Sequence, residues 1–149
     1  VHYYFRTMSD LFAELFREAT EQYLAVLDEV AKSDDPLVRM FELSCDPNSA
    51  GMQLEFLALA NHRKDMQALI TEFGGRLNAR EAEIVRTIME REGITIAGAN
   101  PELLATIIQT AARGLGFAGR FNPERFQQAR ATIIGWLRML AAGTPPLST

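Results

Sequence analysis

Apolar residues recur at helical spacing along almost the whole chain, and this periodicity constrains the fold more than any other feature. An apolar side chain at every third or fourth position marks one face of an α-helix, whereas a half-buried strand shows strict alternation. No segment alternates convincingly. The sequence therefore predicts one all-α domain of six helices, over about residues 8–32, 36–45, 49–61, 62–93, 101–117 and 122–142.

Local signals place the ends of these helices. Thr7 and Asp10 have the spacing of a capping box, in which the threonine hydroxyl accepts from the third amide of the helix. Asn100-Pro101 and Asn122-Pro123 each combine a cap residue with a proline suited to the first helical position. Gly74-Gly75 lies inside the fourth helix, where a glycine pair can bend or divide it.

Composition narrows the class of protein. The chain has 149 residues, of which 48% are apolar, enough for one domain with a real core. No apolar run approaches the roughly 20 residues that cross a bilayer, so no membrane partner is expected. Cys45 is the single cysteine, so an internal disulfide is excluded. A lone cysteine of this kind is expected to be a small buried apolar residue, and the absence of a disulfide suits the reducing cytoplasm. The net charge is −4, and the sequence has no dense stripe of lysine and arginine. The chain by itself is therefore not expected to bind DNA.

Motifs for catalysis are missing. His2 and His62 have no partner at metal-ligand spacing, and no glycine-rich phosphate loop follows a strand. Ser44 and Ser49 lie at helix ends and turns rather than in a nucleophile motif. The sequence predicts a protein that is not an enzyme and that needs no metal or cofactor.

The fifth helix has an unusual distribution of charge. Between Leu103 and Phe117 the only charged residue is Arg113. A helix that is apolar on all sides is expected to be buried on all sides. Either it is the central helix of the domain, or one face packs in the core and another meets a second subunit.

The opening string VHYYFRTMSDL, Val1–Leu11, carries a family resemblance. It resembles the end of the DNA-reading helix in the tetracycline-repressor (TetR) family, where the pattern is roughly L-Y-x-Y-F-x-S-K-x-x-L. Met8 stands where that family usually has a lysine. Looser matches are the Gly93 turn, the segment 100–105 and the segment 113–115.

The resemblance implies a domain organisation. Residues 1–7 would be the remnant of a helix-turn-helix domain, residues 8–142 a ligand-binding and dimerisation domain, and residues 143–149 a flexible tail. His2, Tyr3 and Tyr4 are polar aromatics suited to meeting phosphates and are the candidate DNA contacts. Operator DNA would bind through a head that precedes this chain.

The resemblance also implies a homodimer, in which the fifth and sixth helices of two subunits form a four-helix interface. Two-fold symmetry of this kind suits a palindromic DNA site. The candidate interface residues are Ile108, Ala112, Leu115, Phe126, Ile133, Trp136, Leu137 and Leu140.

Large, soft apolar side chains gather in the second, third and fourth helices, where the family places its effector pocket. Methionine adapts to varied ligands, and ligand sites between helices are mostly apolar with a few polar anchors. An ordinary core would show the same stripe. Arg113 either holds a ligand carboxylate or pairs with an acid across the dimer. The candidate ligand-binding residues are Met40, Phe41, Met52, Phe56, Met66, Ile70, Phe73, Thr110 and Arg113.

Together these features predict a ligand-responsive transcriptional regulator, with repression as the expected mode. A small, largely apolar effector would bind within the helical domain and alter DNA binding by the dimer. The alternative is a helical dimerisation or interaction module with no small-molecule ligand, and a solid core without a ligand-sized void would favour it.

Overall fold

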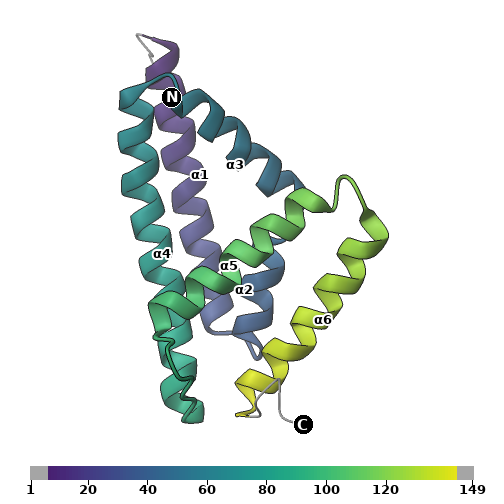
Figure 1. Ribbon diagram of the computed structural model, residues 1–149. Helices are drawn as coiled ribbons and strands as arrows, with labels where there is room; N and C mark the ends of the chain where they lie inside the picture. The colour runs from purple at the N-terminus through teal and green to yellow at the C-terminus, as the bar shows by residue number, and fades with distance from the viewer. Residues whose placement is uncertain (1–6, 144–149) are drawn as a thin grey trace.

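The computed structural model describes residues 7–143, and within that range the chain forms six α-helices and no strand. The predicted all-α fold is confirmed. Helices α1 and α4 run side by side, α5 crosses α4, and α6 lies on the side of the molecule away from α1 (Figure 1). Their bounds are α1 Met8–Ala31, α2 Pro36–Ser44, α3 Pro47–Ala60, α4 Lys64–Glu92, α5 Pro101–Ala118 and α6 Pro123–Ala141.

The cap signals act as their residue types predict. The Thr7 hydroxyl accepts a hydrogen bond from the Asp10 amide at 3.1 Å, and the Asn100 side chain accepts from the Leu103 amide at 2.8 Å. Each satisfies an amide that has no partner inside its own helix. Helix α4 ends at Glu92 and is followed by Gly93, whose φ of 64° lies in the left-handed region that glycine adopts without a steric penalty.

Two helix ends differ from the sequence expectation. Helix α3 already begins at Pro47, because the Asp46 carboxylate caps it by accepting from the Asn48 and Ser49 amides. Helix α4 begins at Lys64 rather than near His62. The glycine pair inside α4 does not divide it, since the helix is continuous from Lys64 to Glu92.

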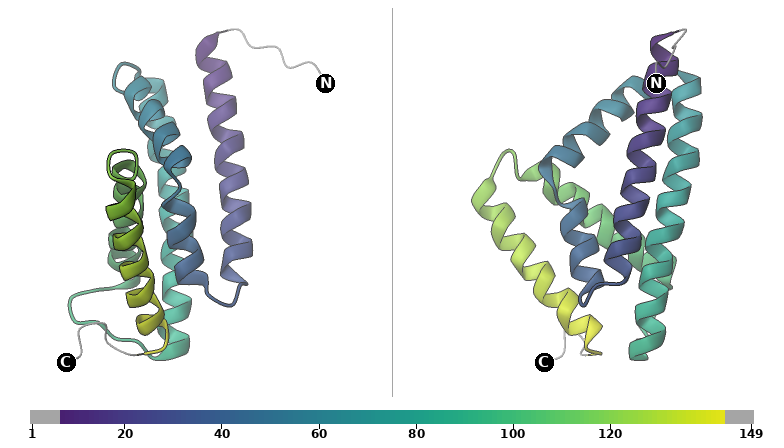
Figure 2. Two further views of the ribbon diagram at one scale, coloured as in Figure 1. Left: turned by 90° about the vertical axis from the view of Figure 1, so that its right-hand side faces the viewer. Right: turned by 180° about the vertical axis from the view of Figure 1, so that it is seen from behind.

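The core surrounds α2, which is short and central. Six of the nine residues in α2 are buried, because α4, α5 and α6 all pack against it. Figure 2 shows α1 and α6 on opposite sides of the molecule, with α2 between them. The apolar residues of this core include Leu27, Leu37, Met40, Phe41, Ile84, Val85, Ile88, Ile108, Ile134, Leu137 and Leu140.

At Gly116, the backbone of α5 packs closely against the turn between α2 and α3. A Cβ atom added at Gly116 would lie 2.9 Å from the Cys45 carbonyl oxygen and 3.2 Å from the Ala50 Cβ. Such contacts are too short for a larger residue without backbone movement. Glycine at this position therefore lets α5 lie directly against the backbone of the turn, which fixes α5 relative to α3.

The two apolar faces of α5 have different surroundings. Its inner face buries Ala105, Ile108 and Ala112, whereas Ile107 on the opposite face is 62% exposed. The helix is therefore not buried on all sides within one subunit. No helix in the described part of the chain is both long enough and apolar enough to cross a membrane.

The residues of the expected dimer interface differ in their burial within the chain. Ile108, Ala112, Leu137 and Leu140 are buried in the core and are at most 8% exposed, so they offer almost no surface to a partner. Helical spacing identifies apolar faces but does not say which of two such faces points inward. Three of the other expected residues are half-buried against the same core, Leu115, Phe126 and Ile133, while Trp136 is exposed.

Candidate functional site

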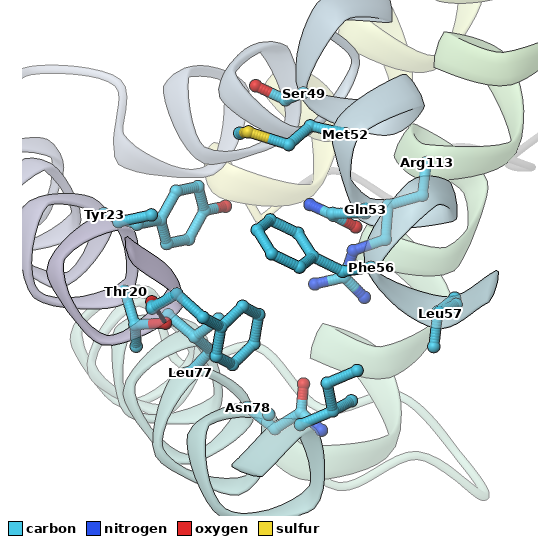
Figure 3. Close-up of a pocket in the computed structure, with 14 residues that line it drawn as sticks. Thr20, Tyr23, Ser49, Met52, Gln53, Phe56, Leu57, Leu77, Asn78 and Arg113 are labelled. Carbon is cyan, nitrogen blue, oxygen red and sulfur yellow. Dashed lines mark hydrogen bonds between the residues drawn. The ribbon is translucent and has the colours of Figure 1, made fainter. Parts of the chain in front are cut away.

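A cavity of about 360 Å³ opens between α1, α3, α4 and α5. This volume falls within the range of roughly 300–1,000 Å³ that small-molecule sites occupy. The close-up in Figure 3 shows the lining side chains converging from these helices. They are Phe16, Ala19, Thr20 and Tyr23 of α1, Ser49, Met52, Gln53, Phe56 and Leu57 of α3, Ile70, Gly74, Leu77 and Asn78 of α4, and Arg113 of α5.

Aromatic contacts close the wall between α1 and the other helices. The ring of Phe16 meets the ring of Phe56 edge-on, with centroids 5.0 Å apart, and that of Phe73 with centroids 5.5 Å apart. Edge-to-face pairs of this kind stabilise beyond their buried area by about 0.5–1.5 kcal/mol. Phe16 thus joins α1 to both α3 and α4 at the level of the cavity.

A buried polar network lies behind the cavity. The Tyr23 hydroxyl and the Ser44 hydroxyl are 2.9 Å apart, and the Gln109 amide donates to the Ser44 hydroxyl at 2.7 Å. Burial raises the pKa of Tyr23, so its hydroxyl stays protonated and available to donate. Gln109 Oε1 is buried without a partner among the described residues, which leaves one acceptor of the network unsatisfied.

Glu81 and Arg113 form an ion pair beside this network. Their closest atoms, Glu81 Oε1 and one Arg113 terminal nitrogen, are 3.4 Å apart. The Glu81 side chain is only 2% exposed, whereas that of Arg113 is 34% exposed and lines the cavity. Burial raises the pKa of Glu81, and Arg113 and the Gln109 amide oppose that rise. The guanidinium therefore lies between a buried acid and the open space of the cavity.

Replacing Glu81 with glutamine is expected to flatten the dependence of stability on pH. Because its folded pKa is raised, the native chain keeps a proton that the unfolded chain loses above about pH 4.3. Over the window from that value up to the folded pKa the unfolded state binds fewer protons, so the free energy of unfolding falls as the pH rises. Urea unfolding from pH 4.5 to 8 measures this slope, and Glu90→Gln, an exposed change in the same helix, is the control. Equal slopes in wild type and Glu81→Gln would contradict the expectation.

The cavity brings together four of the nine residues that were predicted from the sequence to bind a ligand. Met52, Phe56, Ile70 and Arg113 line it. The remaining candidates lie elsewhere. Met40, Phe41 and Met66 are enclosed in the core, Phe73 is buried behind Phe16, and Thr110 is exposed on the outer face of α5.

The sequence prediction named no residue of α1 for this site, and it also left out Ser49 and Gln53 of α3 and Gly74 and Asn78 of α4. Phe16, Thr20 and Tyr23 line the cavity, although the apolar stripe of this helix reads as core packing alone. The Thr20 and Tyr23 hydroxyls were the feature of α1 that could have indicated a ligand site, because they are polar groups beside an apolar stripe. Thr20 donates to the Phe16 carbonyl at 2.8 Å, so its hydroxyl is satisfied locally.

Cys45 is buried, as its sequence context predicted. Burial raises the pKa of its thiol to about 11, which keeps it protonated and unreactive near neutral pH. In the stretch 7–143, no group of three or more His, Cys, Asp or Glu side chains is placed to hold a metal ion. His2, Tyr3 and Tyr4, the candidate DNA contacts, lie outside the described residues.

Comparison with known proteins identifies a family. The family model described as the C-terminal domain of BetI-type transcriptional repressors matches residues 35–142, which is more than half of the chain. Comparison with curated proteins and with solved structures gave no significant match. The resemblance seen in the sequence is confirmed, and the chain belongs to the TetR family of transcriptional regulators, as a C-terminal domain of the BetI type.

Proposed function

We propose that this chain is the effector-binding and dimerisation domain of a ligand-responsive transcriptional repressor. A small, largely apolar effector occupies the cavity between α1, α3, α4 and α5 and alters DNA binding by the dimer. In this proposal residues 8–142 form the regulatory domain, residues 1–7 end a helix-turn-helix head and residues 143–149 are a tail. The single observation that carries the proposal is a ligand-sized cavity lined mostly by apolar groups in a domain of this family. It favours a regulator over an assembly module with a solid core.

Helix α1 is the element that would transmit occupancy of the cavity. Its buried residues, Thr20, Leu27 and Val30, all lie in its second half. Its two ion pairs with α4, Glu21 to Arg76 and Asp28 to Arg80, both at 2.7 Å, lie there too. The first half of α1 is held across the cavity by the Phe16 ring. An effector that displaces this ring would shift the end of α1 that leads toward the DNA-binding head.

This transmission is a shift between two populated states. A ligand moves such an equilibrium only by its difference in affinity for the two states. The space beside Phe16 would be wider in the effector-bound state, so an effector favours that state. In the dimer, tilting both α1 helices would change the spacing of the two heads from the roughly 34–36 Å between successive major grooves.

An exposed apolar surface supports the homodimer. Leu103, Ile107 and Phe117 of α5 are all at least 46% exposed, and they recur at helical spacing on one face. Trp136 and Met139 add exposed apolar surface on α6. Gly114 and Gly135, both exposed, have open space beside them where another helix can approach closely. Exposed apolar residues that gather on two helices packed against each other, as α5 and α6 are, mark interaction sites. We refer to these seven residues as the α5/α6 face.

Hydrogen–deuterium exchange tests the proposed role of α1. Without an effector, amides of residues 8–19 are expected to exchange faster than those of residues 20–31, because the buried residues of α1 all lie in its second half and the first half is held mainly by Phe16. An effector found by thermal-shift screening should slow exchange in residues 8–19 and in the α3 segment that lines the cavity. Uniform protection along α1, or protection confined to α6 when the effector is added, would overturn the proposal.

A further inference from the structure

The charge that the cavity presents to a ligand is positive. Among its lining residues, Arg113 is the only charged one, and the remaining polar lining groups are neutral hydroxyls, amides and a phenol. Figure 3 shows the Arg113 side chain reaching from α5 into the space between α1, α3 and α4. A cationic group within a mostly apolar enclosure interacts more strongly with an anion than the same group does in water.

Most of the hydrogen-bonding capacity of Arg113 is available to a ligand. A guanidinium carries five N–H donors. Within residues 7–143 its one ion-pair partner is Glu81, and their 3.4 Å separation is long for a charge-assisted hydrogen bond. The geometry leaves the outward edge of the guanidinium free to grip a second, planar carboxylate in the bidentate manner that this group favours.

Glu81 does not offer an equivalent site for a cation. Its side chain is 2% exposed and it is not part of the cavity lining. A cationic ligand would also have to approach past the like charge of Arg113. Glu81 instead orients the guanidinium from behind, as a positioning residue.

We infer that the effector is an amphipathic monocarboxylate, whose anionic head binds Arg113 and whose apolar body lies against Phe16, Phe56, Ile70 and Leu77. This inference rests on the proposed function, because it assigns the chemistry of the ligand to the same cavity. The contact between the carboxylate and Arg113 gives selectivity for the head group, and the aromatic and aliphatic lining accommodates the apolar body.

Three compounds with one body and different heads test the inference by isothermal titration calorimetry. They are 4-phenylbutyrate, 4-phenylbutan-1-ol and 4-phenylbutylamine. The carboxylate is expected to bind more tightly than the alcohol by about 10- to 100-fold, the range that hydrogen bonds to charged groups supply. The amine is expected to bind most weakly.

Two variants show whether Arg113 provides the selectivity. Arg113→Met combined with Glu81→Gln removes the guanidinium without leaving a buried unpaired carboxylate, and should bind the carboxylate and the alcohol equally. Glu81→Gln alone should keep the preference for the carboxylate or increase it, because it removes a competing acceptor from Arg113. A role of Arg113 in folding alone would not change the ratio of the two affinities.

The outcomes separate this inference from the proposed function. Equal binding of all three compounds, or tightest binding of the amine, would overturn the inference that the effector carries an anionic head group. Gly74→Leu fills the cavity. If binding of the compounds is lost in this variant, the proposed effector site would still stand. Binding that survives in Gly74→Leu, or no binding by any of the three, would count against the cavity itself and so against both. Carboxylate-selective binding that is lost in Gly74→Leu and kept in Gly75→Leu supports both.

Discussion

Replacing Ile107 with lysine is expected to convert the proposed dimer into monomers, with dimer affinity reduced by about 100-fold or more. Ile107 is the most exposed apolar residue of α5, at 62%, and it belongs to the α5/α6 face. In a two-fold interface the same surface of both subunits meets, so one substitution places two like charges in an apolar contact. Sedimentation velocity at micromolar concentration measures the change.

Val26→Lys is the matched control for this substitution. Val26 is also β-branched and lies on a helix, and it is 43% exposed, but it belongs to α1 on the opposite side of the molecule from α6. A lysine there should leave the dimer intact. Dissociation of both variants to the same extent, or of neither, would contradict the assignment of the interface to the α5/α6 face.

Replacing Gly74 with leucine is expected to abolish effector binding while the fold is kept. Gly74 lines the cavity, and a Cβ added there meets no atom within 4 Å, so a leucine side chain has room to grow into the space that the ligand needs. Removing a glycine from a helix interior should also stabilise α4 by about 0.5–1 kcal/mol. Binding is measured by titration calorimetry, and stability by urea unfolding.

The neighbouring glycine supplies the control. Gly75 is exposed, has no atom within 4 Å of an added Cβ, and is not part of the cavity lining. Gly75→Leu should gain similar helix stability and keep effector binding. Equal loss of binding in the two variants would mean that the effect is on α4 as a whole rather than on the cavity, and unchanged binding in Gly74→Leu would place the ligand elsewhere.

The fold was largely predictable because its boundaries rest on local chemistry. Thr7 and Asn100 cap helices through contacts three residues away, and proline occupies the first turn of α2, α3, α5 and α6. Such signals need no knowledge of tertiary packing. Only the start of α3 and of α4 differed by about two residues, which is the usual uncertainty at helix ends.

The cavity was harder to predict because a pocket and a core use the same residue types. Met40 and Met52 both belong to apolar stretches of neighbouring helices, yet Met40 is fully buried and Met52 lines the cavity. The difference comes from α2 being central while α3 lies at the edge of the domain. Arg113 was recognisable because a single charge in an apolar helix needs a partner. Its partner, Glu81, lies far away in sequence and was not identifiable from it.

The dimer face illustrates the same limit. Helix α5 has two apolar sides, and periodicity gives both equal weight. Packing against α2 and α4 decides that Ile108 points inward, which leaves Ile107 outward. Only one residue of the expected set, Trp136, is strongly exposed on the α5/α6 face.

Occupancy of the cavity is expected to move the first half of α1, and one distance measurement tests this movement. A cysteine placed at Met8, which is 61% exposed at the start of α1, carries one spin label per subunit. The buried Cys45 thiol, with a pKa of about 11, should not be labelled. Electron–electron resonance then reports the distance between the two α1 ends of the dimer. The distance distribution should shift when the effector binds and should not respond to it in Gly74→Leu. An unchanged distribution with the effector bound at saturation would contradict the proposed movement of α1.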